Sequence, residues 1–254
     1  LFKDRYEGEG YYLRDKGMFA VRGETKWDLI DSVQHLFEEL INYLWEKAIS
    51  KYSEDTVTEK DHLEAWGKFA TKAKQGAFLG YGERMLKKDP EVRKTMADYD
   101  ANPLLLNTPV GVVDLTTGKI KRHKDGDMHL KITGTVPNSK KSKLWEETLK
   151  KISCGRPDWE KYFQRRVGYS LYGKQYDQVA VFHLGEHGSN GKTTIFEILG
   201  RALGTYAISA NPIIFQRTKN AGEIQSGVTA LEGTRLVVTS EPSKDHPLDL
   251  PTFK

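Results

Sequence analysis

A glycine-rich turn between two apolar runs constrains this chain more than any other feature. The stretch from Val179 to Leu203 reads VAVFHLGEHGSNGKTTIFEILGRAL. The first run, residues 178–184, predicts a strand buried on both faces of a parallel sheet. After the turn, apolar side chains recur at helical spacing up to Gly204, which predicts a helix that ends at this glycine. A strand, a glycine-rich turn and a helix in this order are typical of an α/β fold with a phosphate-binding loop.

The loop departs by one residue from the usual phosphate-loop pattern. That pattern places four residues between its first glycine and the Gly-Lys pair, whereas five residues separate Gly185 from Gly191 here. The N–H groups that bind anions come immediately before the helix, so an insertion at Glu186 or His187 lengthens only the exit from the strand. We therefore predict that the loop still binds phosphates.

The candidate nucleotide site combines this loop with an acidic residue on a later strand. Lys192 is expected to reach the β and γ oxygens of a nucleoside triphosphate, and Thr193 to bind Mg²⁺. The run TRLVVTSE predicts a buried strand ending in Glu241, which can orient water or act as a general base beside the metal. Lys192 and Glu241 are thus the catalytic candidates, and Thr193 and Glu241 the metal candidates. The residues expected to bind the nucleotide are Gly188, Ser189, Asn190, Gly191, Lys192, Thr193 and Thr194.

Other kinds of site are disfavoured. His183 and His187 are four residues apart, but one ends a strand and the other lies in a loop, so we interpret them as non-ligands. Cys154 is the single cysteine, which rules out an internal disulfide framework and suits a reducing cytosol; we interpret it as an inert thiol. No apolar run approaches the length of a membrane span. The net charge of +4 permits contact with nucleic acid without requiring it.

Residues 1–143 are predicted to form a smaller mixed α+β region. Hairpins are expected around Asp15–Gly17 and Thr116–Gly118, where apolar residues flank a turn with glycine. Helical spacing predicts an amphipathic helix from Leu29 to about Ser50 and a second helix around residues 63–70. Two short helices are expected on either side of Pro90.

The boundary between two regions is predicted just after Lys143. The polar run NSKKSK, residues 138–143, indicates a solvated connection rather than a phosphate contact. Beyond it, apolar residues at helical spacing predict two amphipathic helices before the glycine-rich loop, the first around Trp145 and the second around Phe163.

The chain resembles a known family at several places. FHLGEHGSNGKTT followed by LEGTRLVVTSE resembles the first two motifs of the superfamily 3 helicases, ring-forming AAA+ motors of viruses, phages and plasmids. NPLLLNTPVGVVDLTTGKI, WEETLKKI and YFQRRVGYSLYG are similar to the segment that precedes the motor in phage and plasmid primase-helicases and in related poxvirus-type proteins. The resemblance implies an α/β fold with a P-loop AAA+ parallel sheet, incomplete at its C-terminal end. Residues 144–254 would be the amino-terminal part of the ATPase domain, and residues 1–143 a collar or spacer.

The same resemblance implies an activity. Gly191, Lys192 and Thr193 would bind MgATP, and Glu241 would be the acidic residue of the second motif. Ser240 stands where many AAA+ proteins have Asp, which implies a metal contact through water. The parent protein would be a replicative DNA helicase that forms a hexameric ring and moves along single-stranded DNA in the host cytoplasm. Its expected partners are the single strand, further copies of the chain and replication proteins of the host, with no membrane.

The family's arginine finger, sensor asparagine and DNA-gripping hairpin lie downstream of the second motif. The chain begins with Leu1 and ends at Lys254, so we expect a fragment that carries the ATP cradle without the full catalytic ring. Two other functions fit the same loop: a small-molecule P-loop kinase, and a nucleotide-responsive oligomerisation or origin-binding module without unwinding activity.

Overall fold

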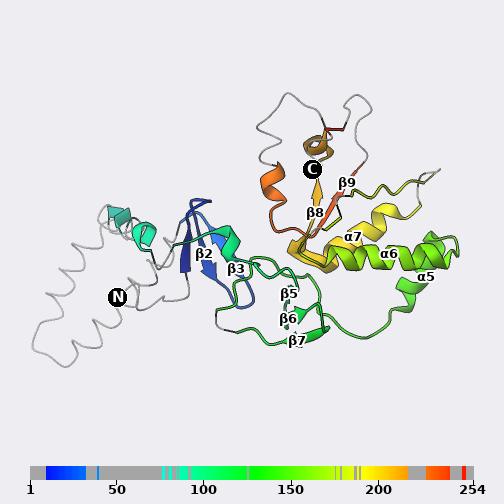
Figure 1. Ribbon diagram of the computed structural model, residues 1–254, viewed down its shortest axis with the longest axis horizontal. Helices are drawn as coiled ribbons and strands as arrows, with labels where there is room; N and C mark the ends of the chain where they lie inside the picture. Colours follow the sequence, from blue (N-terminus) through cyan, green and yellow to red (C-terminus); the bar gives the residue numbers. More distant parts are fainter. Residues whose placement is uncertain are drawn as a thin grey trace, which may run out of the picture. The chain divides into compact units, whose positions relative to one another are not determined.

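Two units, Leu1–Tyr99 and Asp100–Lys254, make up the chain in the computed structural model (Figure 1). The boundary predicted from composition, after Lys143, lies inside the second unit. The structure describes residues 10–32, 39, 76–77, 80–81, 84, 86–90, 93–124, 126–174, 176–177, 179–185, 188, 190–216, 227–240 and 248–249.

The first unit contains a four-stranded sheet in the order β3-β2-β1-β4. Its strands are β1 (Gly10–Leu13), β2 (Met18–Arg22), β3 (Trp27–Ile30) and β4 (Arg93–Lys94). The antiparallel pairing of β1 with β2 confirms the predicted hairpin. Trp27 is buried in the core, where its ring contacts Tyr11 at 5.3 Å and Tyr99 at 5.7 Å between centroids. Aromatic rings thus connect the sheet to the last residue of the unit.

The helix predicted from Leu29 onward does not begin there. Leu29 belongs to β3 and pairs with Ala20 of β2, so cross-strand hydrogen bonds decide its conformation rather than the helical spacing that follows it. Glu39 is helical, and the other residues of that predicted helix beyond Ser32 lie outside the described residues. The helix predicted around residues 63–70 lies outside them as well.

The region around Pro90 is helical on one side only. Residues 86–88 form a helix before the proline, as predicted. After it, Arg93–Lys94 forms β4, which pairs in parallel with β1, and Met96–Asp98 forms the short 3-10 helix η1. The second predicted helix is therefore wrong, because pairing with a strand far away in the sequence replaced the local helical preference.

The second unit begins with a three-stranded antiparallel sheet. Its strands are β5 (Leu105–Thr108), β6 (Gly111–Asp114) and β7 (Lys119–Lys121), in the order β5-β6-β7. The β6–β7 pair confirms the second predicted hairpin, and β5 is an additional strand. The polar run at residues 138–143 that follows is exposed, and residues 138–142 have no regular structure, as expected of a solvated connection.

Three helices follow: α5 (Lys143–Ile152), α6 (Pro157–Ser170) and α7 (Lys192–Leu203). The Ser142 hydroxyl caps α5 by accepting the Trp145 N–H at 3.3 Å. Pro157 occupies the first turn of α6, where a missing N–H costs nothing. The two predicted amphipathic helices and the predicted helix that ends at Gly204 are confirmed.

Helix α7 packs into two hydrophobic clusters. Ile195 and Leu199 face α5 and α6, and Leu203 faces the β5–β6 hairpin. Fully burying each of these side chains stabilises the fold by roughly 1.5–3 kcal/mol. A hydrogen bond also holds the C-terminal turn of α7, because the Gly134 N–H donates to the Ala202 carbonyl at 3.0 Å. The helix that follows the glycine-rich loop is therefore held along its whole length.

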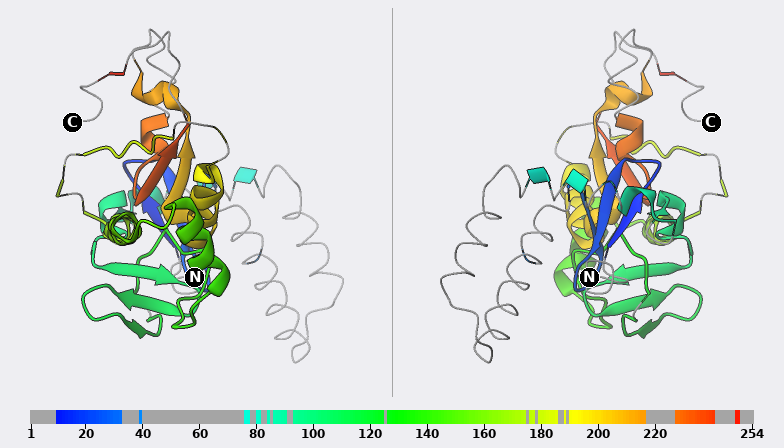
Figure 2. Two further views of the ribbon diagram at one scale, coloured as in Figure 1. Left: turned by 90° about the vertical axis from the view of Figure 1, so that its right-hand side faces the viewer. Right: turned by 90° about the vertical axis from the view of Figure 1, so that its left-hand side faces the viewer.

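A two-stranded parallel sheet follows α7. After the short helix η2 (Gly204–Tyr206), strand β8 (Ala207–Ala210) pairs with β9 (Leu236–Thr239), which lies beyond the short helix η3 (Pro212–Phe215). The two strands run side by side in both views of Figure 2. The fold is therefore mixed α/β, but the extended P-loop parallel sheet that we predicted is reduced to this pair among the described residues.

No helix within the described part of the chain combines the length and the apolar character needed to cross a membrane.

Candidate phosphate-binding loop

The loop enters α7 through a glycine in a left-handed conformation. Gly191 is the N-cap residue, with φ 77° and ψ 6°, a region that side chains other than glycine rarely adopt. A Cβ atom there would also lie 2.7 Å from Ile152 Cδ1 of α5. Two independent constraints thus require glycine at this position. Gly191 has no side chain that could cap the first turn of α7, and no acidic residue lies in that turn, an arrangement suited to an anion.

The two ends of the loop approach each other despite the additional residue. A Cβ atom built on Gly185 would lie 2.6 Å from Asn190 Nδ2 and 3.0 Å from Lys192 Nζ. The backbone of the first glycine therefore faces the amine and the amide that the sequence assigns to phosphate binding. Between these ends, Glu186, His187 and Ser189 lie outside the described residues.

The other predicted nucleotide-binding residues differ in exposure. Lys192 is half-buried, whereas Thr193 and Thr194 in the first turn of α7 are exposed. Gly188 is exposed as well, with open space where a Cβ atom would lie. The structure thus places a half-buried cation beside a solvent-facing helix N-terminus, a geometry that can hold phosphate oxygens.

His183 belongs to the packing beneath the loop. Its ring lies edge-on to Phe196 at 4.9 Å and to Phe163 at 6.1 Å between centroids. Burial, and secondly the charge of Lys192, lower the pKa of this imidazole from its ordinary value, so the ring is neutral at pH 7. Among the described residues, no group of three or more His, Cys, Asp or Glu side chains could hold a metal ion. His183 is therefore an aromatic packing residue, and His187 lies outside the described part.

The apolar run before the loop is not a buried strand. Residues 179–185 have no strand pairing, and Phe182 and Leu184 are 62% and 91% exposed. A strand becomes buried only where neighbouring strands satisfy its backbone and other layers cover its faces. The described sheet next to α7 consists of β8 and β9 alone, and residues 179–185 have no regular secondary structure. The predicted buried strand is therefore wrong for these residues.

The predicted second-motif strand is present. It corresponds to β9, which pairs with β8 in register from Ala207 with Leu236 to Ala210 with Thr239. The strand alternates between half-buried and exposed positions, so it is less buried than we predicted. Ser240 is exposed, and Glu241 lies outside the described residues. The role of Glu241 beside Lys192 stays a prediction.

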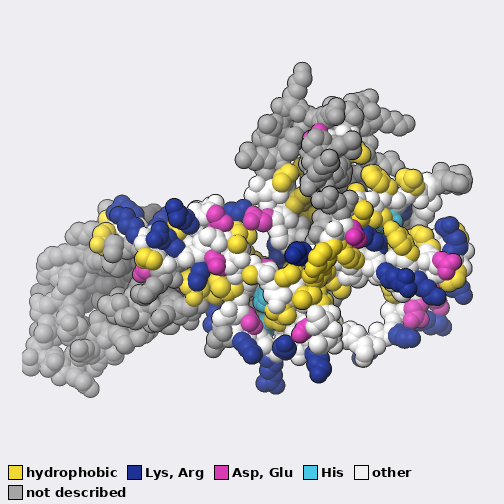
Figure 3. Space-filling model, in the orientation of Figure 1, with side chains coloured by type: hydrophobic (Ala, Val, Ile, Leu, Met, Phe, Trp, Pro, Cys, Tyr) yellow, Lys and Arg dark blue, Asp and Glu magenta, His cyan; other side chains and the backbone are white. Residues whose placement is uncertain are grey.

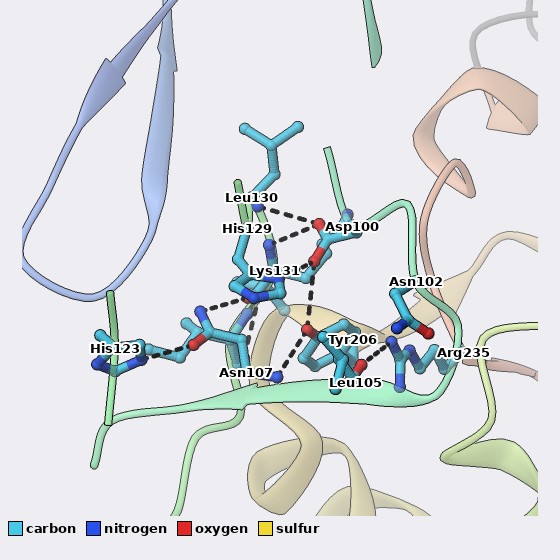
Figure 4. Close-up of polar contacts among 12 residues, drawn as sticks. Asp100, Asn102, Leu105, Asn107, His123, His129, Leu130, Lys131, Tyr206 and Arg235 are labelled. Atoms are coloured by element: carbon cyan, nitrogen blue, oxygen red, sulfur yellow. Dashed lines mark hydrogen bonds and ion pairs between the residues drawn. The ribbon is translucent and has the colours of Figure 1, made fainter. Parts of the chain in front are cut away.

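Arg235 is a structural residue that sequence reasoning missed. It immediately precedes β9, and its guanidinium donates hydrogen bonds to the carbonyls of Leu171 and Leu105. It also lies over the Tyr206 ring, with Cζ 4.5 Å from the centroid (Figure 4). A charged residue directly before an apolar strand is a weak signal for such a role. Arg235 joins the start of β9 to the end of α6 and to β5.

The network in Figure 4 extends from Tyr206 to the half-buried carboxylate of Asp100. The Tyr206 hydroxyl accepts the Asn107 N–H at 3.1 Å and donates to Asp100 Oδ1 at 3.4 Å. Asp100 also accepts the N–H groups of Leu130 and Lys131 at 3.0 and 3.2 Å. These contacts attach the β5–β6–β7 sheet to the β8–β9 pair.

Replacing Arg235 by methionine is expected to destabilise the second unit. Methionine fills much of the same volume but leaves two carbonyls without their charged donor, a loss of about 3 kcal/mol. Thermal unfolding should show a melting temperature lower by roughly 10 °C. Arg201→Met, at an exposed position of α7, is the matched control and should melt like the wild type. Equal melting of both variants would show that the network contributes nothing.

Replacing Gly191 by alanine is expected to destabilise the protein by roughly 1–2 kcal/mol, because alanine is strained at this φ. Adding Ile152→Val removes the Cδ1 atom nearest the new methyl group. The double variant should regain the part of the stability lost to the steric clash, but not the part lost to backbone strain. Urea unfolding measures both. Gly188→Ala is the control, since that glycine has open space around it and no positive φ. A Gly191→Ala protein as stable as the Gly188→Ala protein would contradict the geometry.

Comparison with protein families gives a match over more than half of the chain. A family model described as "D5 N terminal like" matches residues 1–154, from the start of the chain through α5. The matched residues include both hairpins and end before the glycine-rich loop. No curated protein matches the chain.

Proposed function

The chain belongs to the D5 N terminal like family, which is associated with phage and viral primase-helicase proteins, and on that premise we propose that the parent protein is an ATP-dependent replicative DNA helicase. The proposal extends the replication role of the family to the region after residue 154, where the glycine-rich loop lies. One observation carries it: Gly185 lies against Asn190 and Lys192, so the loop closes at the N-terminus of α7.

MgATP fits this closed loop by the chemistry of its donors. The N-cap residue Gly191 offers no side chain to the N–H groups of the first turn of α7, and these groups suit phosphate oxygens. Lys192 adds a positive charge for the β and γ oxygens, and the Thr193 hydroxyl would ligate Mg²⁺. The metal, when bound, neutralises charge that develops on the phosphates. Glu241, two residues after β9 in the sequence, would orient or deprotonate the attacking water.

Ring assembly is the second part of the proposal. We expect a hexamer of the parent protein that moves along single-stranded DNA and works with replication proteins in the cytoplasm of the host cell. A cation supplied by the neighbouring subunit would couple hydrolysis to assembly, because phosphoryl transfer is catalysed by positioning and charge.

A titration with a fluorescent ATP analogue and Mg²⁺ tests the nucleotide part. The full chain is expected to bind the analogue saturably. Unlabelled ATP should displace it much better than AMP, since AMP lacks the phosphates that Lys192 contacts. Displacement by AMP as effective as by ATP would place the bound molecule away from the loop and overturn the assignment.

Gel filtration of the full-length parent tests the ring. ATP and a single-stranded oligonucleotide together should shift the protein to a much larger species. A protein that stays monomeric under these conditions, while it still binds the analogue, would favour a P-loop kinase over a helicase.

A further inference from the structure

A row of aromatic and basic side chains, half-buried to exposed, follows α6 and continues into the residues after it. On the helix, positions 162, 166 and 169 lie on one face because their spacing is four and then three residues. In Figure 3, hydrophobic and basic side chains lie next to one another over the region of α5 and α6. We call the set the tyrosine row. Its members are Tyr162, Arg166, Tyr169, Tyr172, Lys174 and Tyr176.

Two rings of the row form a preorganised stack. Tyr172 and Tyr176 lie 5.4 Å apart between centroids with 8° between their planes, and their hydroxyls are 2.8 Å apart. The Tyr169 hydroxyl accepts the N–H groups of Tyr176 and Asp177 at 2.8 and 3.1 Å, which fixes the backbone beneath the stack. A surface that is ordered before binding loses little entropy when a ligand arrives.

The first and last tyrosines of the row are exposed, whereas Tyr169 and Tyr172 are half-buried. Tyr176 is 65% exposed and Tyr162 is 51% exposed, so neither contributes much to a core. The neighbour of Tyr162, Phe163, points about 100° away around the helix and is buried in the cluster with Ile195. The two ends of the row therefore present aromatic rings to solvent.

Cations lie against the rings. Arg166 Cζ is 5.0 Å from the Tyr169 centroid, and Lys174 Nζ is 5.5 Å from the Tyr176 centroid. The carboxylate of Asp177 is 3.8 Å from Arg166 Nη1, with both side chains partly exposed, so the ion pair is weak. The positive charges thus remain available to an anionic ligand that also carries planar groups.

We propose that the tyrosine row binds single-stranded nucleic acid. Bases stack on the exposed tyrosine rings, and phosphates contact Arg166 and Lys174. A single strand fits this chemistry because its bases are free to leave their neighbours, and stacking on aromatic side chains tolerates any base. In a duplex the base faces are covered by neighbouring pairs. The inference rests on the proposed function only in that the partner is a nucleic acid, and it locates that partner.

Fluorescence anisotropy with a fluorescein-labelled oligothymidylate tests the row, on the full chain without nucleotide. Tyr176→Ala is expected to weaken binding by roughly 5- to 150-fold, the loss measured when one stacked base loses its ring. Tyr176→Phe keeps the ring and should bind like the wild type. The matched control is Tyr81→Ala, at a tyrosine of the first unit that is 58% exposed, and it should leave binding unchanged.

The salt dependence of the affinity distinguishes the contribution of the cations to binding from that of the tyrosine rings. Lys174→Ala should reduce the slope of log affinity against log salt by about 0.7, the value for one phosphate contact on a single strand. Equal losses in Tyr176→Ala and Tyr81→Ala, or a duplex bound as tightly as the single strand, would overturn the proposal.

The ATP analogue titration, repeated on Tyr176→Ala, keeps the two proposals distinguishable. Unchanged analogue affinity together with weakened oligothymidylate binding is the expected result. Lost analogue binding with intact oligothymidylate binding would assign the stack to the nucleotide and contradict the row as a nucleic-acid site. If the wild-type protein binds the oligothymidylate but not the analogue, the result contradicts nucleotide binding by the loop and leaves the proposal for the tyrosine row standing.

Discussion

Lys192→Ala is expected to abolish binding of the ATP analogue at concentrations that saturate the wild type and to lower ATP turnover by about 10²–10³-fold. The reason is that Lys192 is half-buried at the start of α7 and its amine lies beside Gly185. A preorganised charge of this kind stabilises the phosphates without reorganisation, and removing one such donor typically has an effect of this size. Analogue titration and phosphate release measure the two effects.

Lys140→Ala is the matched control, because it removes the same charge from an exposed position in the solvated connection. It should bind and hydrolyse ATP like the wild type. Lys192→Arg should fail to restore activity, since a planar guanidinium does not present its charge as a compact ammonium does. Wild-type turnover in Lys192→Ala would remove the loop from the mechanism.

Glu241→Gln is expected to retain analogue binding and to lower hydrolysis by about 10²–10⁴-fold, the usual contribution of a positioned general base. Glutamine has nearly the same shape but cannot accept the proton from the attacking water. Binding should be equal or tighter, because the neutral amide does not repel the γ-phosphate. Single-turnover phosphate release separates chemistry from binding. It is measured at an ATP concentration that the analogue titration shows to be saturating.

Glu197→Gln tests whether the loss is specific. Glu197 is an exposed glutamate of α7, so this change alters the net charge equally and should leave hydrolysis intact. Unchanged hydrolysis in Glu241→Gln would assign water activation to another residue. A parallel loss of analogue binding would indicate a structural role for Glu241 instead.

Local sequence features predicted the helices of the second unit well. α5, α6 and α7 each carry apolar residues at helical spacing, and capping residues such as Ser142 and Gly191 mark their starts. Such signals lie within a few residues of the element that they specify, so they are visible without the rest of the fold. The two hairpins were predictable for the same reason, because each turn connects adjacent strands.

Predictions failed where pairing joins residues that are distant in the sequence. β4 pairs with β1 across most of the first unit, and this contact replaced a predicted helix. The buried strand predicted at residues 178–184 is not formed at the described residues 179–184, because strand formation and burial depend on neighbouring strands and not on the run itself. Arg235 escaped detection because its partners Leu105 and Leu171 lie 130 and 64 residues away.

The sequence by itself determined the glycine-rich loop, the helix that follows it and the residue types available for phosphate binding, because these depend on short-range spacing and conformational preference. The tertiary structure decided that Gly185 faces Lys192, that Arg235 attaches β9 to β5, and that Tyr172 and Tyr176 stack at the surface. The Arg235 contact arises only when packing brings distant segments together. The other two join residues seven and four positions apart, and they depend on the course of the backbone between them, which residue spacing alone does not give.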